Sequence, residues 1–383
     1  MSLTKTTAFP AVERLFGGQP LIAPHGQAWE SGVTFNSSAV FLEATEENRP
    51  LIQRLLGPGE EVRDIVALHY RARPRQDPGF EFTRSYVGLS IHEPDLMPIR
   101  RFEAPVLSPC KGDAPDVLGV EDPRVTYLDG AYWMVYCGVQ PLDDPDPMKT
   151  WLGSVCIARS ENLVDWTKVG VAEGLCDRGP QPVSNKDGVL FPERIDGKVM
   201  MFHRPLAGDI DTWETCIAVA DSPEGPFTDL GSVHGPARRE GYVKSWTGAG
   251  AVPIKIGEGR YLSIEHTGNY LAGKQRKYVL DAFLYDFNDW DPAHPETLVK
   301  ARLDDFMRPE TDFEVKSPFH DSVANVVFAC GAYVHDGWIY MVYGGGDTYI
   351  LAARVRYDEL LGALESREEP REAAVAEPVA VSR

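Results

Sequence analysis

Hydrophobic and polar residues alternate in short segments along most of the chain, and the spacing typical of helices is rare. Runs of roughly four to eight residues rich in Val, Ile, Tyr, Trp and Phe are separated by Gly, Pro and Asp. This pattern predicts β-strands joined by tight turns. Only the segments Asn48–Leu56 and Tyr357–Leu364 have the spacing of a helix. The chain is therefore expected to be almost entirely β.

A hairpin pattern recurs along the chain, with a strand, a tight turn and a second apolar strand that ends in polar residues. The turn glycines are Gly130, Gly197, Gly259 and Gly337, and three of them follow an aspartate, which is a strong hairpin pattern. A third apolar strand follows most hairpins, and the pair Val33–Glu43 and Asp64–Arg73 forms a further unit without the glycine turn. Five units of antiparallel strands predict a five-bladed β-propeller, with an irregular pair of β-sandwiches as the alternative.

The repeats also suggest limits for the domains. We expect an N-terminal extension at 1–32, a catalytic propeller at 33–365 and a tail at 366–383. The tail is rich in Ala, Glu and Pro without periodicity, so we expect it to be disordered.

Composition excludes several classes of function. The chain has 383 residues, 43% of them hydrophobic, and a net charge of −19, which argues against a nucleic-acid partner. It has no apolar run of about 18 residues and no apolar signal segment near its start, so we expect no membrane span and a cytoplasmic location. The nine histidines and six cysteines show no HxH, HExxH or CxxC spacing, so no metal site is expected.

Charged residues collect where the strands of each unit end. In a propeller these ends face one central funnel, so the five units are expected to build a shared pocket. Carboxylates beside aromatic residues suit sugar chemistry, and Arg, Lys and His suit a bound oxyanion. In chain order the candidates are Asn36, Arg71, Glu121, Asp122, Arg124, Lys186, His203, Arg204, Glu265, His266, Asn325 and Asp347.

Several of these motifs, in this order, resemble glycoside hydrolase family 130, the β-mannoside phosphorylases and their hydrolytic relatives. The resemblance covers roughly residues 34–354 and implies a five-bladed propeller, in agreement with the repeats. The motifs are TFNSSAV (34–40), HYRA (69–72), GVEDPRVT (119–126), LFPERIDGK (190–198), HRP (203–205), GAGAVPIK (248–255), EHTG (265–268), ANVVFACG (324–331) and YGGGDT (343–348).

The resemblance implies a reaction and an acid. Family members cleave a β-mannosidic bond with inversion, and in the phosphorylases inorganic phosphate is the nucleophile and α-mannose 1-phosphate the product. The matching general acid is Asp122, which would pass its proton to the bridging oxygen through a mannose hydroxyl. A phosphorylase needs one catalytic carboxylate, whereas an inverting hydrolase needs a second to activate water.

The resemblance also assigns binding residues. The phosphate ligands would be Arg71 and Arg204, with Lys186, His203 and His266 as weaker candidates. The sugar would contact Asn36, Glu121, Arg124, Asn325 and Asp347. The expected partners are a short oligosaccharide and inorganic phosphate as co-substrate, with no cofactor. The oligomeric state is left open, with a homo-oligomer as one option.

Two departures from the family pattern keep the hydrolase open. Many phosphorylases carry a lysine just before the segment that matches Gly248–Gly250, where this chain has Trp246 and Thr247. Glu265 occupies a place that usually holds Tyr or Ala. Glu265 is therefore a candidate base for water, or else an ion-pair partner of Arg71 or Arg204.

Three functions are ordered by these observations. A phosphorylase comes first because Arg71, Arg204 and His266 remain, a β-mannosidase second, and a non-catalytic sugar-binding propeller last because the Asp122 motif is intact. Adjacent residues of a regular strand point to opposite faces, so Glu121 and Asp122 make a poor pair of acids for a retaining glycosidase. Acceptor specificity is expected in the loops Pro141–Thr150 and Leu206–Trp213.

Overall fold

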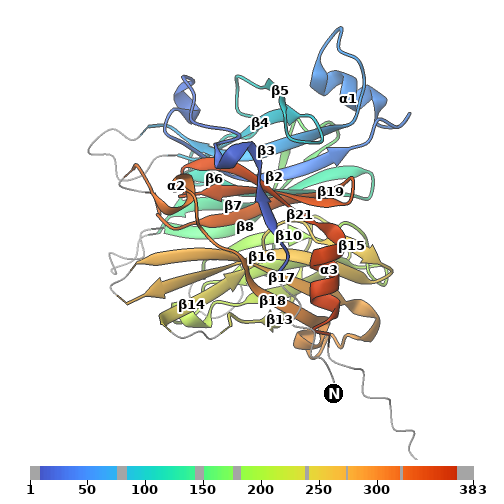
Figure 1. The fold of residues 1–383 in the computed structure, drawn as a ribbon, viewed down its shortest axis with the longest axis vertical. Helices are drawn as coiled ribbons and strands as arrows, with labels where there is room; N and C mark the ends of the chain where they lie inside the picture. Colours follow the sequence, from blue (N-terminus) through green and yellow to red (C-terminus); the bar gives the residue numbers. More distant parts are fainter. Residues whose placement is uncertain are drawn as a thin grey trace, which may run out of the picture.

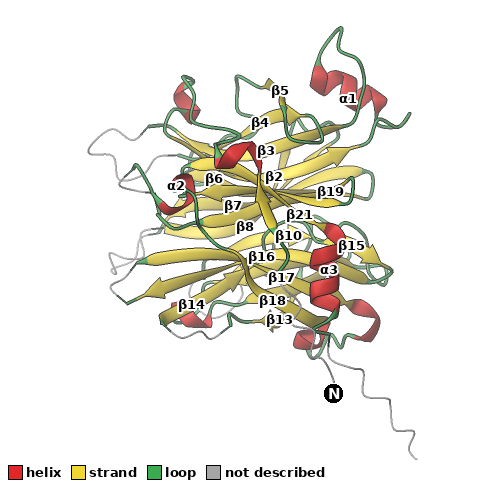
Figure 2. Ribbon diagram, viewed as in Figure 1, coloured by secondary structure: helices red, strands yellow, loops and turns green. Residues whose placement is uncertain are grey.

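Five antiparallel sheets form the fold of the computed structural model, which describes residues 9–75, 84–142, 151–175, 183–237, 241–272, 275–319 and 322–368. They are the blades of a five-bladed β-propeller, as the repeats predict (Figure 1). In this view the first blade lies at the top and the fourth at the bottom, with the fifth-blade strands β19 and β21 between them. The expected all-β class is confirmed, and Figure 2 shows only short helices around the strands.

The blades follow one another along the chain, and most hold four strands. Blade 1 contains β2 (Val33–Leu42), β3 (Ile65–Arg73), β4 (Tyr86–His92) and β5 (Pro98–Arg101). Blade 2 contains β6 (Gly119–Leu128), β7 (Ala131–Pro141), β8 (Trp151–Ser160) and β9 (Thr167–Val171). Blade 3 contains β10 (Asn185–Leu190), β11 (Val199–Pro205), β12 (Thr215–Ala220) and β13 (Thr228–His234).

The last two blades differ in how they are assembled. Blade 4 contains β14 (Tyr242–Gly248), β15 (Ile254–Gly257), β16 (Arg260–Leu271), β17 (Arg276–Asp286) and β18 (Val299–Met307). Blade 5 contains β19 (Val327–His335), β20 (Trp338–Gly345), β21 (Tyr349–Arg356) and the N-terminal β1 (Val12–Arg14). Because β1 pairs antiparallel with β21, part of the expected extension 1–32 belongs to the propeller and joins the two ends of the chain.

Helices lie between and outside the blades. The two expected from the sequence are present as α1 (Arg49–Leu56) and α3 (Tyr357–Glu365), and α2 (Asp312–Val315) precedes blade 5. Short 3-10 helices occur as η1 (Leu15–Gly18), η2 (Ala28–Glu30), η3 (Ile210–Thr212), η4 (Phe287–Asp289) and η5 (Pro295–Leu298). Of the expected tail 366–383, residues 369–383 lie outside the described part of the chain.

The hairpin turns have the backbone that their residues favour. Asp129 and Gly130 both have positive φ, of 53° and 77°, and Asp336 and Gly337 have the same pattern at 47° and 74°. Two successive residues with positive φ make the turn that matches the twist of a hairpin, and Asp-Gly suits it. The turn at Gly259 is also present, between β15 and β16.

Apolar clusters between adjacent blades form the core. Val40 and Met134 belong to the cluster between blades 1 and 2, and Leu303 and Met341 to that between blades 4 and 5. Comparable clusters join blades 2 and 3, 3 and 4, and 5 and 1. This packing holds the first strand of each blade against its neighbours, which brings the polar ends of those strands together.

Candidate active site

Three equivalent positions on the first strands of blades 1 to 3 break the strand pattern. Asn36, Asp122 and Asp187 have positive φ, of 49°, 50° and 57°, and the strand register shifts beside each of them. Asn and Asp tolerate this left-handed conformation better than other side chains, and such a bulge re-aims the side chain. All three are buried and contact residues of a neighbouring blade.

Asp122 lies at the centre of the first cluster. Its Oδ1 accepts a hydrogen bond from Asn36 Nδ2 at 2.8 Å and one from Arg71 Nη1 at 3.0 Å. Its Oδ2 accepts one from Lys186 Nζ at 3.2 Å. Burial alone raises the pKa of Asp122, but Lys186, Arg71 and Arg124 together hold that pKa well below its ordinary value. Asp122 is therefore a carboxylate in the ligand-free protein.

Glu121 shares a partner with Asp122, which the sequence reasoning did not expect. Arg71 donates from Nη2 to Glu121 and from Nη1 to Asp122. The expectation that the two acids point to opposite faces assumed a regular strand, and the register shift between Glu121 and Arg124 removes that regularity. The Arg71 guanidinium pairs with both carboxylates, so neither Glu121 nor Asp122 stands apart as an independent second acid.

A second cluster surrounds Asp187, a polar residue at a strand end of the third unit to which the sequence assigned no role. Its Oδ2 lies 2.7 Å from Arg204 Nη2 and 3.4 Å from His266 Nε2, and its Oδ1 lies 3.5 Å from Arg124 Nη2. A Cβ on Gly248 would lie 2.3 Å from Asp187 Oδ2 and 2.8 Å from His266 Nε2. Only a glycine therefore leaves room for this contact, and the adjoining sequence Asn-Lys-Asp-Gly was the available indication.

Arg124 links the blades under the two clusters. Its buried guanidinium donates to the backbone oxygens of Asp122, Ala249 and Gly250, at 3.0 to 3.1 Å, and lies 3.5 Å from Asp187. These contacts use four of the five N–H donors of the guanidinium. The structure places Arg124 in the support of the site, and its predicted contact with sugar stays untested.

Arg204 and His266 carry unused donors and acceptors in the second cluster. Nε and Nη1 of Arg204 are buried and have no hydrogen-bond partner among the described residues. The guanidinium lies 5.8 Å from the centre of the Trp213 ring, on the loop that follows β11. Burial lowers the pKa of His266, although Asp187 opposes the change. Arg204 can therefore bind an anion with two N–H groups that the protein does not use.

Asp347 joins the site from the turn between β20 and β21, also with a positive φ of 47°. Burial raises its pKa to about 6, against the opposing effect of Arg71 and with a further rise from Asp122. Asn325 lies just before β19, has a φ of 59°, and accepts a hydrogen bond on its backbone oxygen from Tyr278. Tyr278 interacts electrostatically with Arg204, Lys186 and Asp347, so it belongs to this site although its sequence context gave no indication.

Two predicted site residues lie elsewhere. His203 is buried with Nδ1 3.0 Å from Asn185 Nδ2 and Nε2 3.4 Å from Asp229. Since neighbouring residues of a strand point to opposite faces, His203 cannot share the side of β11 that Arg204 occupies. The structure thus does not bring His203 to the other predicted phosphate ligands.

Glu265 is the second displaced residue. Its carboxylate accepts hydrogen bonds from Tyr285 at 2.5 Å and from Thr215 and Ser263 at 3.2 Å, and lies 3.0 Å from His234 Nε2. Its side chain is fully buried. Glu265 therefore contacts neither Arg71 nor Arg204, and the prediction that it pairs with them is wrong. Its enclosure also argues against a role as a base for water.

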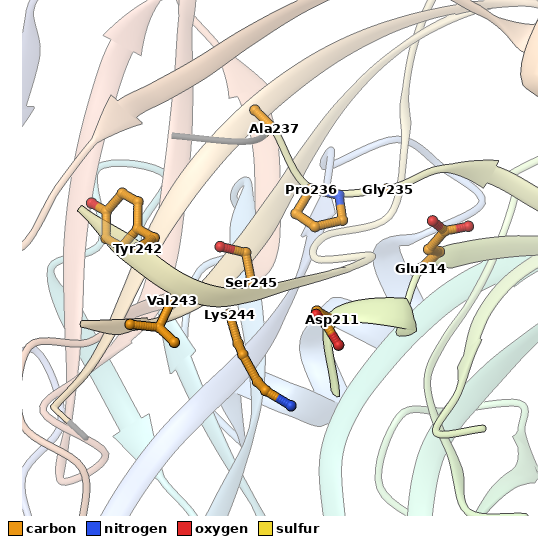
Figure 3. Close-up of a pocket in the computed structure, with 9 residues that line it drawn as sticks. All are labelled: Asp211, Glu214, Gly235, Pro236, Ala237, Tyr242, Val243, Lys244 and Ser245. Carbon is orange, nitrogen blue, oxygen red and sulfur yellow. The ribbon is translucent and has the colours of Figure 1, made fainter. Parts of the chain in front are cut away.

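A cavity of about 450 Å³ lies between the segment that follows β11 and strand β14, and none of its lining residues belongs to either cluster. Figure 3 shows Asp211 and Glu214 across from the strand that carries Lys244 and Ser245. Trp213 lies between the two acids in the chain, and its backbone oxygen accepts a hydrogen bond from Thr247. Of the predicted acceptor loop Leu206–Trp213, Asp211 lines this cavity. Most of the other predicted loop, 143–150, lies outside the described residues.

The described residues contain neither a candidate metal site nor a candidate membrane span. Within them, no group of three or more His, Cys, Asp or Glu could hold a metal ion. No helix in the same ranges is long and apolar enough to cross a bilayer.

A family model described as beta-1,4-mannooligosaccharide phosphorylase matches residues 84–366. The chain belongs to glycoside hydrolase family 130. The predicted family and enzyme class are confirmed.

Individual relatives in family 130 agree with this assignment. A 1,2-beta-oligomannan phosphorylase from a Thermoanaerobacter species is 29% identical over 340 residues, which cover 87% of this chain and 93% of the relative. A beta-1,2-mannobiose phosphorylase from Listeria innocua is 28% identical over 305 residues, covering 79% and 70%. The solved structure of a beta-1,2-mannobiose phosphorylase from Listeria innocua aligns with a TM-score of 0.67 at 22% identity, over 93% of this chain and 99% of that chain.

Proposed function

We propose that this protein is an inverting phosphorylase that cleaves the β-mannosidic bond of short mannosides with inorganic phosphate. The observation that carries the proposal is the pair of buried, unused N–H groups on Arg204, beside Asp187 and across from the Asp122 cluster. Charged N–H donors that have no partner in the protein suit an oxyanion such as phosphate. Lys186 and Arg71 supply further positive charge on the Asp122 side.

The proposed reaction needs one acid and one nucleophile. Phosphate attacks the anomeric carbon, the bond from this carbon to the bridging oxygen breaks, and Asp122 supplies the proton that the leaving oxygen takes, through a hydroxyl of the mannosyl unit. The products are α-mannose 1-phosphate and the shortened acceptor. In total, the hydrogen of HPO₄²⁻ ends on the acceptor hydroxyl, so the equation balances without another reactant.

The remaining predicted residues divide between sugar and support. Asn36 fixes the orientation of Asp122 by donating to Oδ1, so we propose it as a positioning residue that also faces the mannosyl unit. Asp347 and Asn325 come from blade 5, opposite Lys186 and Arg71, and we propose that they bind sugar hydroxyls. Glu121 holds Arg71 in place.

The hydrolase alternative is weakened, because the surroundings of Glu265, the base that the sequence suggested, argue against that role. An inverting hydrolase needs a second carboxylate that can contact water. Glu265 is fully enclosed and engaged by Tyr285, His234, Thr215 and Ser263. No observation in the described residues favours hydrolysis over phosphorolysis.

The acceptor is proposed to extend toward the cavity beside Trp213. The exposed part of this half-buried ring, next to Arg204, offers an apolar face for a sugar, and Asp211 and Lys244 offer polar partners further out. We also propose a cytoplasmic location, because phosphorolysis retains the energy of the glycosidic bond as a sugar phosphate inside the cell.

A panel of β-mannosyl disaccharides tests the proposal, with β-1,2-mannobiose first because the two relatives named above are described as phosphorylases of β-1,2-linked mannosides. Release of mannose 1-phosphate is measured with and without inorganic phosphate. The expected result is turnover that requires phosphate and is lost in Asp122→Asn. Release of free mannose at the same rate without phosphate would identify a hydrolase, and no turnover across the panel would leave a sugar-binding propeller.

A further inference from the structure

The catalytic carboxylate and the expected phosphate ligands compete for the same positive charges. Asp122 must carry a proton to act as an acid, yet it accepts hydrogen bonds from Lys186 at 3.2 Å and from Arg71 at 3.0 Å. These two cations are also among the groups that the proposed function assigns to phosphate. As long as both cations face Asp122, the carboxylate is held in its charged form.

Exposure differs between the partners in a way that favours an entering anion. The side chains of Lys186 and Arg71 are 18% and 11% exposed, whereas that of Asp122 is 2% exposed. An anion that approaches from solvent therefore meets the cations before the carboxylate. The ammonium of Lys186 has three N–H groups, and its hydrogen bond to Asp122 uses one of them.

We propose that binding of a dianion to Lys186 and Arg71 is coupled to protonation of Asp122, so that arrival of the nucleophile loads the general acid with its proton. The inference rests on the proposed function, because it takes phosphate as the physiological dianion. Bound phosphate draws the two cations toward itself and adds negative charge beside Asp122. Both changes favour the neutral carboxyl, and the proton comes from solvent or from H₂PO₄⁻, which leaves HPO₄²⁻ as the nucleophile.

Other groups around Asp122 set the background for this coupling. Asn36 on β2 donates to Oδ1 of Asp122, Arg124 on β6 donates to the backbone oxygen of Asp122, and Glu121 accepts from one side of Arg71. Cys137 on β7 and Cys330 on β19 also face Asp122, and burial raises the pKa of each thiol, so both remain neutral.

Asp347 is the second acid that could take up a proton. Its pKa is raised to about 6, with burial as the main cause and Asp122 as a contributor. An anion nearby would raise this pKa further, so the test has to separate the two carboxyls. Asp122→Asn and Asp347→Asn each remove one of them while keeping the size of the side chain.

Titration of the full-length protein with sulfate tests the coupling. Sulfate has the shape and charge of HPO₄²⁻ but does not itself titrate near neutral pH. Any proton taken up on binding is therefore taken up by the protein and not by the anion. Calorimetry in buffers of different ionisation enthalpy, between pH 5.5 and 8, measures that uptake. We expect proton uptake on binding and an affinity that rises as the pH falls, by up to about tenfold per pH unit if one proton is fully linked.

The variants show which of the two carboxyls takes up the proton. Asp347→Asn should retain the uptake, and Asp122→Asn should bind sulfate at least as tightly with none, because Lys186 is then released. If Asp122→Asn does not fold, Lys186→Met replaces it and should show reduced uptake. Saturable anion binding without uptake in the unmodified protein would overturn the coupling and leave the phosphorylase standing. Absence of binding by both sulfate and inorganic phosphate would overturn the proposed function itself.

Discussion

Replacing Asp187 with asparagine removes one buried negative charge that three groups share. Asp187 lies 2.7 Å from Arg204, 3.4 Å from His266 and 3.5 Å from Arg124, and its side chain is fully buried. Arg204 and Arg124 are almost fully buried as well, at 4% and 1% exposed. The Asp187→Asn variant therefore leaves two guanidinium groups inside the protein without their shared counter-charge.

The expected cost follows from these contacts. Removing one partner of a buried ion pair costs about 3–5 kcal/mol, because the other charge stays buried and uncompensated. Arg124 keeps three backbone acceptors, so we expect a value near the lower limit, about 3 kcal/mol. For a chain of this length that corresponds to a fall in melting temperature of roughly 4 °C. Displacement of Arg204 should also lower kcat/KM for phosphorolysis by about 100-fold.

Thermal unfolding and steady-state kinetics with varied phosphate measure both effects. Asp221→Asn is the matched control, because Asp221 is 86% exposed and pairs with Lys198 at 2.5 Å on the surface. An exposed pair contributes little, so this variant should match the unmodified protein in both assays. If Asp187→Asn melts within 1 °C of the unmodified protein and its KM for phosphate is unchanged, Asp187 does not hold Arg204 for catalysis.

Three further changes test other parts of the account. Gly268→Ala should destabilise by about 1–3 kcal/mol because its Cβ would lie 2.3 Å from the Trp246 ring, whereas Gly362→Ala, which meets nothing within 4 Å on α3, should not; equal melting temperatures would contradict this. Glu265→Gln should melt lower but keep phosphate-dependent turnover, and loss of turnover in folded protein would restore its catalytic role. The pKa of Asp347 is raised to about 6, so the folded protein binds this proton more tightly than the unfolded chain does. The free energy of unfolding therefore falls as the pH rises from 4 to 6. The urea midpoint of Asp347→Asn should lack this part of the fall.

Much of the fold was predictable because its strongest determinants are local. The turns at Gly130 and Gly337 follow from Asp-Gly pairs, and both residues of each turn have the positive φ that such pairs favour. Two parts depended on contacts that are distant in sequence. Strand β1 joins β21 from the other end of the chain, and β14, which ends at Gly248, forms the inner edge of blade 4 by pairing with β16.

The sequence indicated several residues of the candidate site but not how they are grouped. Polar residues at strand ends led to the expectation of Asp122, Arg71, Lys186 and Arg204 in one funnel, and the structure places Arg71 and Lys186 on Asp122 but Arg204 on Asp187. The bulge that places Glu121 and Asp122 on one guanidinium depends on a left-handed backbone, which alternation along a regular strand does not anticipate.

For Glu265, in contrast, the alternation of side chains along a regular strand would have been sufficient to predict its position. It precedes His266 on β16, and adjacent side chains of a regular strand point to opposite faces. His266 contacts Asp187 and so faces the funnel. Glu265 must therefore face the opposite side of the strand, toward the interface between blades. Its partners, Tyr285, His234 and Thr215, lie on that side.

The most direct test of the central claim is to follow the phosphorus and sugar signals by NMR while the protein acts on β-1,2-mannobiose in phosphate buffer. The account predicts that α-mannose 1-phosphate appears at the same rate as free acceptor mannose, in equal amount, and that neither product forms when phosphate is omitted. Two molecules of free mannose per disaccharide, with no sugar phosphate and no dependence on phosphate, would contradict it.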